Sequence, residues 1–214
     1  MRNDLLTCLK ELAGPHVAVG VSEVDSDDGL LAPEPEAVAK AIPKRRAEFA
    51  AGRRAARMAM RNANMAEVAI PKGDNRAPVW PAGVVGSVSH DGDFAIAAVA
   101  PLRSIRALGI DLAEAADFPE HLRNEILLTP AERAQTGLEA RVSFSAKETV
   151  FKSFYPSVGR YFGFGAVEIA PDLSTGTFTV TVLEDLAPIP RGSSFSGRVG
   201  RTEAHLITLL NVPN

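Results

Sequence analysis

The sequence FSAKETVFKSFYP, residues 144–156, predicts a helix with one apolar side and one charged side. Apolar residues at 144, 150, 151 and 154 would face a core, while Glu148 and Lys152, four residues apart, would project together from another side. Three interpretations fit: a surface ion pair worth about 0.2–0.5 kcal/mol, a capping box of Ser145 and Glu148 at a helix start, or a functional carboxylate beside an ammonium group. Residues 138–154 contain neither Pro nor Gly, which favours one long helix and weakens the capping-box interpretation.

The composition bounds the class of protein. The 214 residues are 46% apolar and 23% charged, which is typical of one large globular domain or two small ones. A net charge of −3 argues against a protein that coats nucleic acid. The single cysteine, Cys8, excludes an intramolecular disulfide, and we find neither zinc-ligand spacing nor an apolar run long enough for a membrane span. We therefore expect a cytoplasmic protein that binds neither nucleic acid nor a membrane.

Short strands and a few helices alternate along the chain. Helical patterns are predicted over 4–12, 35–62 and 138–154, and a helix start with proline at its first position over 129–133. Strands are predicted over 16–21, 84–92, 94–100 and 105–110, and four more over 166–169, 176–183, 194–201 and 205–212, most simply an antiparallel meander. Residues 70–81 are predicted to form a turn-rich loop. The pattern indicates an α+β protein of two comparable halves that divide near residue 104.

The second helical segment is strongly basic. Between Lys40 and Arg61 there are eight Lys or Arg residues against one acid, Glu48. Arg46, Arg53 and Arg57 recur at helical spacing, which predicts a row of guanidinium groups facing water. Such a row is either an ordinary solvated face or a site for an anion, because guanidinium binds phosphate oxygens in a bidentate manner.

Two polar residues stand at the ends of predicted strands. Asp111 directly follows the strand at 105–110, a position that suits a metal ligand and a helix N-cap equally well. His90 ends another strand, where a hydrogen-bonded structural histidine is the commoner role.

Five motifs together resemble a known family. They are KRRAEFAAGR at 44–53, PVWP followed by GSVSH within 78–90, LGID at 108–111, FSAKETVFKSFYP at 144–156 and YFGF at 161–164. In this order and spacing they resemble the signature blocks of 4′-phosphopantetheinyl transferases of the Sfp/EntD type, the siderophore-synthetase component D branch especially. The resemblance covers roughly residues 40–170.

The resemblance implies a fold and an activity. The fold would be α+β with two pseudo-symmetric subdomains, residues 1–104 and 105–214, each with helices packed on an antiparallel sheet, that enclose coenzyme A at their junction. The enzyme would transfer 4′-phosphopantetheine from coenzyme A to a serine of an apo acyl or peptidyl carrier protein and release 3′,5′-ADP, serving siderophore, nonribosomal peptide or polyketide synthesis. Mg²⁺, or Mn²⁺ in its place, would be the cofactor, and the enzyme would be a monomer.

The resemblance also implies roles for particular residues. In the N-terminal subdomain, the residues that match binders of coenzyme A are Arg45, Arg53 and Lys72 at the 3′-phosphoadenosine end and Ser89 and His90 at the diphosphate. In the C-terminal subdomain, Asp111 and Glu148 match the metal carboxylates, Lys152 matches the lysine near the transferring phosphate, and Glu132 matches an acid beside the metal site.

Elementary chemistry supports these roles. Coenzyme A carries a 3′-phosphate and a diphosphate, so its binder needs several separated cations. The carrier serine is a poor nucleophile until a base accepts its proton, and Glu148 is the best candidate for that base. Lys152, one helical turn further on, would stabilise or protonate the departing ADP oxygen.

One position departs from the family pattern. The family commonly has an acid two residues after the aspartate, where this chain has Ala113, and the nearest acid is Glu114. A shift of one residue in an extended segment points the side chain to the other face. We therefore expect a metal site of Asp111, Glu148 and water, because Mg²⁺ commonly keeps several waters.

Two alternatives come from other classes of protein. A non-catalytic nucleotide-binding module would use the basic helix and would not need Asp111, Glu148 or Lys152. A Mg²⁺-dependent hydrolase would consume coenzyme A without a carrier protein.

Overall fold

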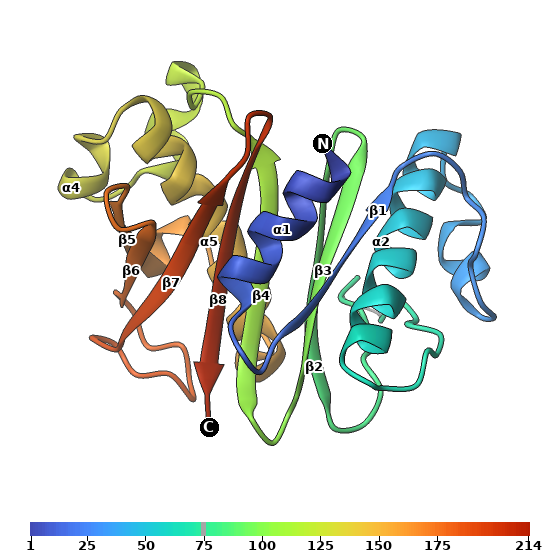
Figure 1. The fold of residues 1–214 in the computed structure, drawn as a ribbon. Helices are drawn as coiled ribbons and strands as arrows, with labels where there is room; N and C mark the ends of the chain where they lie inside the picture. The colour runs from blue at the N-terminus through green and yellow to red at the C-terminus, as the bar shows by residue number, and fades with distance from the viewer. Residues whose placement is uncertain (74–75) are drawn as a thin grey trace. The chain divides into compact units, whose positions relative to one another are not determined.

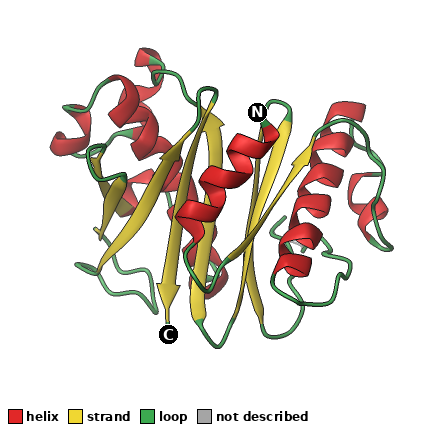
Figure 2. Cartoon of the chain, viewed as in Figure 1, coloured by secondary structure: helices red, strands yellow, loops and turns green. Residues whose placement is uncertain are grey.

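The computed structural model describes residues 1–73 and 76–214 and divides into two compact units (Figures 1 and 2). Unit 1 comprises Met1–Leu108 with Pro213–Asn214, and unit 2 comprises Gly109–Val212. The loop expected at 70–81 includes residues 74 and 75, which lie outside the described residues. Within the described part of the chain, no helix is long and apolar enough to cross a membrane.

Unit 1 is built on a three-stranded antiparallel sheet of order β1-β3-β2. Its elements are α1 (Arg2–Ala13), β1 (Ala18–Glu23), the 3₁₀ helix η1 (Glu34–Val38), α2 (Pro43–Asn62), β2 (Val84–Asp91) and β3 (Phe94–Pro101). The central strand β3 is buried over 94–100, and α2 packs on β1 and β3 (Figure 1). A core of small and apolar side chains lies between helix and sheet.

The helix α2 approaches β1 unusually closely because glycine and alanine meet there. A Cβ at Gly20 of β1 would collide with the backbone of α2 at Ala55 and Ala59. Asn62, at the end of α2, donates to the carbonyl oxygen of Val19 at 2.9 Å. The small residues of the basic segment therefore serve helix–strand packing.

The structure corrects two expectations about this segment. The α-helix begins at Pro43 and not at residue 35, because Ile42, which precedes a proline, is extended (φ −64°, ψ 155°) and proline favours the first helical position. The prediction that a row of guanidinium groups faces water was wrong for Arg53 and Arg57, which are only 5% and 6% exposed.

The physical reason is an acidic loop, residues 23–36, that folds back over α2. Glu34 is fully buried and accepts two hydrogen bonds from Nη1 of Arg57, at 2.8 and 3.0 Å. Asp25 pairs with Arg54 at 2.7 Å, and Asp27 pairs with Arg46 at 3.0 Å. Much of the positive charge of α2 is thus neutralised within unit 1.

Unit 2 is built on the sheet of order β4-β8-β7-β6-β5, in which β5 to β8 form the expected antiparallel meander. Its elements are β4 (Ile105–Glu114), η2 (Glu120–Leu122), α3 (Arg123–Ile126), α4 (Pro130–Arg133), α5 (Gly137–Val158), η3 (Phe164–Ala166), β5 (Val167–Asp172), β6 (Thr177–Val182), β7 (Ser194–Arg201) and β8 (His205–Pro213). The boundary between the two units falls within β4. The predicted α+β class, with helices packed on antiparallel sheets, is confirmed.

The long helix α5 contains the whole motif at 144–156. Its close approach to β4 needs Gly109, since a Cβ there would collide with the backbone of α5 at Thr149. At its other end, Phe154 packs edge-on against Phe195 of β7, with ring centroids 5.0 Å apart. The helix ends at Gly159, which adopts the left-handed conformation that favours glycine (φ 68°). Ser145 and Glu148 therefore lie in the helix interior, which excludes a capping box formed by them.

Candidate active site

Asp111 lies inside β4 and begins no helix, so the N-cap interpretation is excluded. The residue is 6% exposed, and its carboxylate is held from α5: Nζ of Lys152 donates to Oδ1 at 2.6 Å, and Oγ of Ser145 donates to Oδ2 at 2.8 Å. A strand thus supplies the acid and a helix supplies both donors. The Lys152 side chain remains about a quarter exposed.

Glu148 lies one turn before Lys152 on α5 and has a perturbed carboxyl group. Burial raises the pKa of Glu148, the negative charge of Asp111 raises it further, and the Lys152 ammonium opposes both. The two carboxylates are therefore close enough to interact electrostatically, in a partly buried place where a cation would relieve their repulsion.

Within residues 1–73 and 76–214 no group of three or more His, Cys, Asp or Glu side chains could hold a metal ion, so Asp111 and Glu148 belong to no larger cluster of this kind. Alternation along β4 places Ala113 on the same face as Asp111 and Glu114 on the opposite face, where the Glu114 side chain is exposed. Hard carboxylate oxygens with waters in the remaining positions fit Mg²⁺, which commonly binds through one or two carboxylates.

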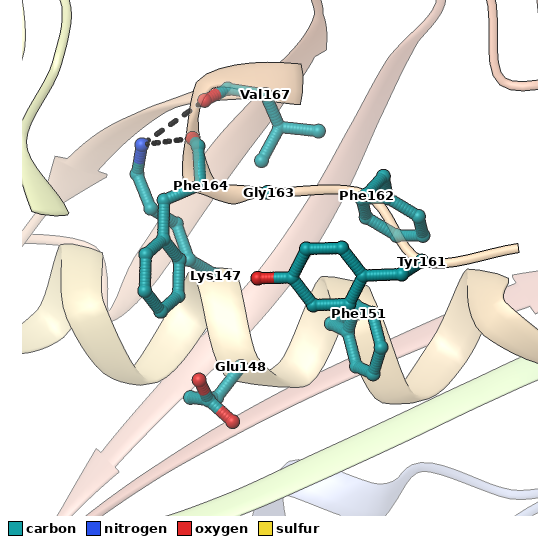
Figure 3. Close-up of a pocket in the computed structure, with 8 residues that line it drawn as sticks. All are labelled: Lys147, Glu148, Phe151, Tyr161, Phe162, Gly163, Phe164 and Val167. Carbon is teal, nitrogen blue, oxygen red and sulfur yellow. Dashed lines mark hydrogen bonds between the residues drawn. The ribbon is translucent and has the colours of Figure 1, made fainter. Parts of the chain in front are cut away.

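A hollow of about 250 Å³ adjoins Glu148 (Figure 3). Its walls come from α5 and from the segment 161–167, and half of the lining residues are aromatic: Phe151, Tyr161, Phe162 and Phe164. The ring of Phe151 lies 5.0 Å from that of Phe162 and 5.7 Å from that of Tyr161, centroid to centroid. Tyr161 is 75% exposed, so the apolar wall continues to the surface.

Lys147 and Glu132 fix one wall of this hollow. The Lys147 ammonium donates to the carbonyl oxygens of Phe164 and Val167, at 2.7 and 3.1 Å (Figure 3). It also donates to Glu132 at 2.9 Å. Glu132 is fully buried, forms a capping box with Thr129 at the start of α4 and accepts from the backbone N–H of Ile169 at 2.9 Å. The structure thus places Glu132 in a buried ion pair, whereas its catalytic role stays a prediction.

The predicted binders of coenzyme A lie in unit 1 in two local environments. Arg45 is half-exposed and its Nη1 donates to Nε2 of His90 at 2.8 Å and to Glu48 at 3.2 Å. Because arginine has no acceptor, Nε2 of His90 must accept, which places the proton of neutral His90 on Nδ1. Ser89 precedes His90 on β2 and is 6% exposed.

Arg53 and Lys72, the other two predicted binders of coenzyme A with cationic side chains, differ from each other in burial. The guanidinium group of Arg53 lies 4.1 Å from the ring centroid of Phe49, and its Nε donates to the carbonyl oxygen of Ile70 at 2.6 Å. Burial lowers the pKa of Arg53 to about 10, with Glu34 opposing the shift, so the group stays cationic at neutral pH. Lys72 is exposed and donates to the carbonyl oxygen of Ala37 at 3.2 Å. Lys72 is thus the more accessible of these two cations.

Two contacts around the site were not predicted from the sequence. Ser145 stands in the quoted motif, but its partner Thr208 lies 63 residues away in a strand with no polar pattern of its own. The pairing of Lys147 with Glu132 was also missed, although the Thr129 and Glu132 spacing was a capping signal that could have indicated a structural position for that acid.

Comparison with known proteins finds matches in both units. The family model described as the 4′-phosphopantetheinyl transferase N-terminal domain matches residues 33–100, and the 4′-phosphopantetheinyl transferase superfamily model matches residues 107–205. The chain is 38% identical over 189 residues to 4′-phosphopantetheinyl transferase Svp of Streptomyces mobaraensis, covering 84% of this chain and 76% of the relative. It is 33% identical over 190 residues to 4′-phosphopantetheinyl transferase PptT of Mycobacterium tuberculosis (82% and 81% covered) and 38% identical over 121 residues to enterobactin synthase component D of Escherichia coli (51% and 55% covered). These matches across both units show that the chain belongs to the 4′-phosphopantetheinyl transferases.

Proposed function

We propose that this protein transfers the 4′-phosphopantetheine group of coenzyme A to a serine hydroxyl of an apo acyl or peptidyl carrier protein and releases 3′,5′-ADP. The observation that carries the proposal is the arrangement of Asp111, Glu148 and Lys152 at the edge of α5 and β4. It combines the two kinds of charged group that transfer at phosphorus requires. The carboxylates can bind a cation and accept a proton, and the ammonium group can stabilise the departing oxygen.

Each side chain has a part in the bond changes. A bond forms between the serine Oγ and the β-phosphorus of coenzyme A, and the bond between that phosphorus and the bridging oxygen breaks. Glu148 accepts the serine proton, a task for which burial suits it because its raised pKa makes it a stronger base than an exposed glutamate. Lys152 donates to the oxygen that departs with 3′,5′-ADP.

Asp111 and Glu148 would hold Mg²⁺, or Mn²⁺ in its place. When bound, the ion supplies charge neutralisation at the diphosphate oxygens. Lys152 pairs with Asp111 at 2.6 Å, so its ammonium group partly compensates the charge of this carboxylate.

The cations of unit 1 are also assigned to coenzyme A in this proposal. We assign Arg45, Arg53 and Lys72 to the 3′-phosphoadenosine end and Ser89 and His90 to the diphosphate. Arg45 and His90 form one hydrogen-bonded group, which brings the two sets of residues together within this unit. The aromatic hollow next to Glu148 suits the pantetheine arm, because that arm is largely aliphatic and is attached to the phosphate that Glu148 and Lys152 address.

The test is the intact mass of a purified apo carrier protein after incubation with this protein, coenzyme A and Mg²⁺. We expect a gain of one phosphopantetheine that disappears when EDTA is added. A reaction without carrier protein distinguishes the hydrolase, which would consume coenzyme A with no acceptor present. Coenzyme A binding without any mass gain, across carriers from siderophore, polyketide and fatty-acid synthesis, would favour the nucleotide-binding module.

Protons and Mg²⁺ are expected to compete for Glu148. Its raised pKa means that the folded protein holds this proton more tightly than the unfolded chain does, so the associated stability is present at low pH and is lost as pH rises through the folded pKa. Activity should depend on pH in the opposite direction, because protonation of Glu148 at low pH removes the base. In pH profiles of kcat/KM, the acid limb should move to lower pH when Mg²⁺ is raised from subsaturating to saturating. If the acid limb keeps the same position at both Mg²⁺ concentrations, Glu148 is not both a metal ligand and the base.

A further inference from the structure

A chain of three buried hydroxyl groups ends on Asp111. Thr149 and Ser145 lie one turn apart on α5, and Thr208 faces them from β8. Oγ1 of Thr149 lies 2.7 Å from Oγ1 of Thr208, which lies 2.9 Å from Oγ of Ser145, which lies 2.8 Å from Oδ2 of Asp111. The three hydroxyl-bearing residues are fully buried.

The chain has one direction when Asp111 is ionised. A carboxylate only accepts, so the Ser145 hydroxyl must donate to Asp111. Ser145 has one proton, so its oxygen accepts from Thr208. By the same count, Thr208 accepts from Thr149. The three O–H groups therefore donate in sequence toward the carboxylate, and hydrogen bonds in such a series polarise one another. The carbonyl oxygen of Thr208 is a second, longer acceptor for Thr149, at 3.3 Å.

This arrangement fixes the carboxylate as well as stabilising it. Ser145 binds Oδ2 and Lys152 binds Oδ1, so donors on two different oxygens set the rotation of the Asp111 carboxyl group. Simple packing does not call for hydroxyl groups here, because Ala and Val would fill the same volume without the cost of burying polar groups. The buried hydroxyl groups are explained if Ser145 must hold the Asp111 carboxylate in one orientation.

We propose that Ser145 and Thr208 are positioning residues that orient Asp111 for the divalent cation, with Thr149 as the outer support. The proposal rests on the proposed metal role of Asp111 and Glu148. Groups that orient a metal ligand typically alter metal affinity or activity about 10- to 100-fold when they are removed. The effect should fall along the chain, from Ser145→Ala through Thr208→Val to Thr149→Val.

The test is Mn²⁺ binding to the free protein, followed by the electron paramagnetic resonance signal of unbound Mn²⁺, with no substrate present. Ser145→Ala should weaken binding about tenfold or more. The matched control is Ser143→Ala, since Ser143 is also fully buried on α5 but donates to Gln135. It should lose stability in a similar way and keep its Mn²⁺ affinity.

A second pair of variants separates the hydroxyl group from the shape of the side chain. Thr208→Val keeps the shape and removes the donor, whereas Thr208→Ser keeps the donor, so only Thr208→Val should weaken Mn²⁺ binding. Equal affinity in wild type, Ser145→Ala and Thr208→Val would overturn the positioning role and leave the metal site intact. Failure of the wild type to bind Mn²⁺ would overturn the metal site and this proposal with it.

Discussion

Glu148→Gln should lower kcat/KM for carrier modification by about 10²- to 10⁴-fold, the range typical for loss of a general base. The amide has nearly the same shape as the acid but accepts no proton, so the serine nucleophile loses its partner. Because burial already raises the pKa of Glu148, a neutral side chain is tolerated at this position, and the free energy of unfolding should stay unchanged or rise slightly. The measurement is steady-state transfer to an apo carrier protein, beside thermal unfolding of the same preparations.

Glu139→Gln is the matched control for this prediction. Glu139 lies on the same helix and is exposed, so the identical chemical change should leave the transfer rate near that of wild type. Mn²⁺ binding then divides the two roles of Glu148: weaker binding in Glu148→Gln supports a metal ligand, and unchanged binding with a lost rate supports a base alone. Nearly full activity in Glu148→Gln would contradict both roles.

The sequence was sufficient to predict the helix that contains Glu148 and Lys152. Apolar spacing and the absence of Pro and Gly predicted α5 over 138–154, and the structure extends it to Gly137–Val158. The four-residue spacing of Glu148 and Lys152 was readable because helical geometry is local. Five ordered motifs indicated the family, which the matching family models and relatives confirm.

The interactions between distant segments could not be read in the same way. Periodicity cannot say what covers a helix face, so the burial of Arg57 against Glu34 was missed. Thr208 looks like any threonine in a strand until folding brings it beside Ser145. Ion pairs and hydroxyl chains depend on tertiary contacts, and a single sequence gives no measure of those.

Lys147→Met should lower the free energy of unfolding by about 3–5 kcal/mol, the usual cost of removing one partner of a buried ion pair. The substitution leaves the Glu132 carboxylate fully buried without its cation, and it frees the carbonyl oxygens of Phe164 and Val167. Glu132→Gln should also destabilise, because it leaves the Lys147 ammonium buried without its anion. Urea unfolding followed by circular dichroism measures both effects.

The double variant Glu132→Gln with Lys147→Met tests whether the two residues act as a pair. It should cost less than the sum of the single changes, since neither charge remains unpaired. As the control, Arg61→Met removes one partner of the exposed pair Arg61–Glu67 and should leave the free energy of unfolding nearly unchanged.

The same variants decide the role of Glu132. If Glu132 only holds the structure in place, Glu132→Gln should lose stability but keep most of its kcat at temperatures below the unfolding transition. If Glu132 is catalytic, Glu132→Gln should lose kcat at temperatures where the protein is fully folded. Additive costs in the double variant would contradict the pair, and the wall of the aromatic hollow would then need another source of rigidity.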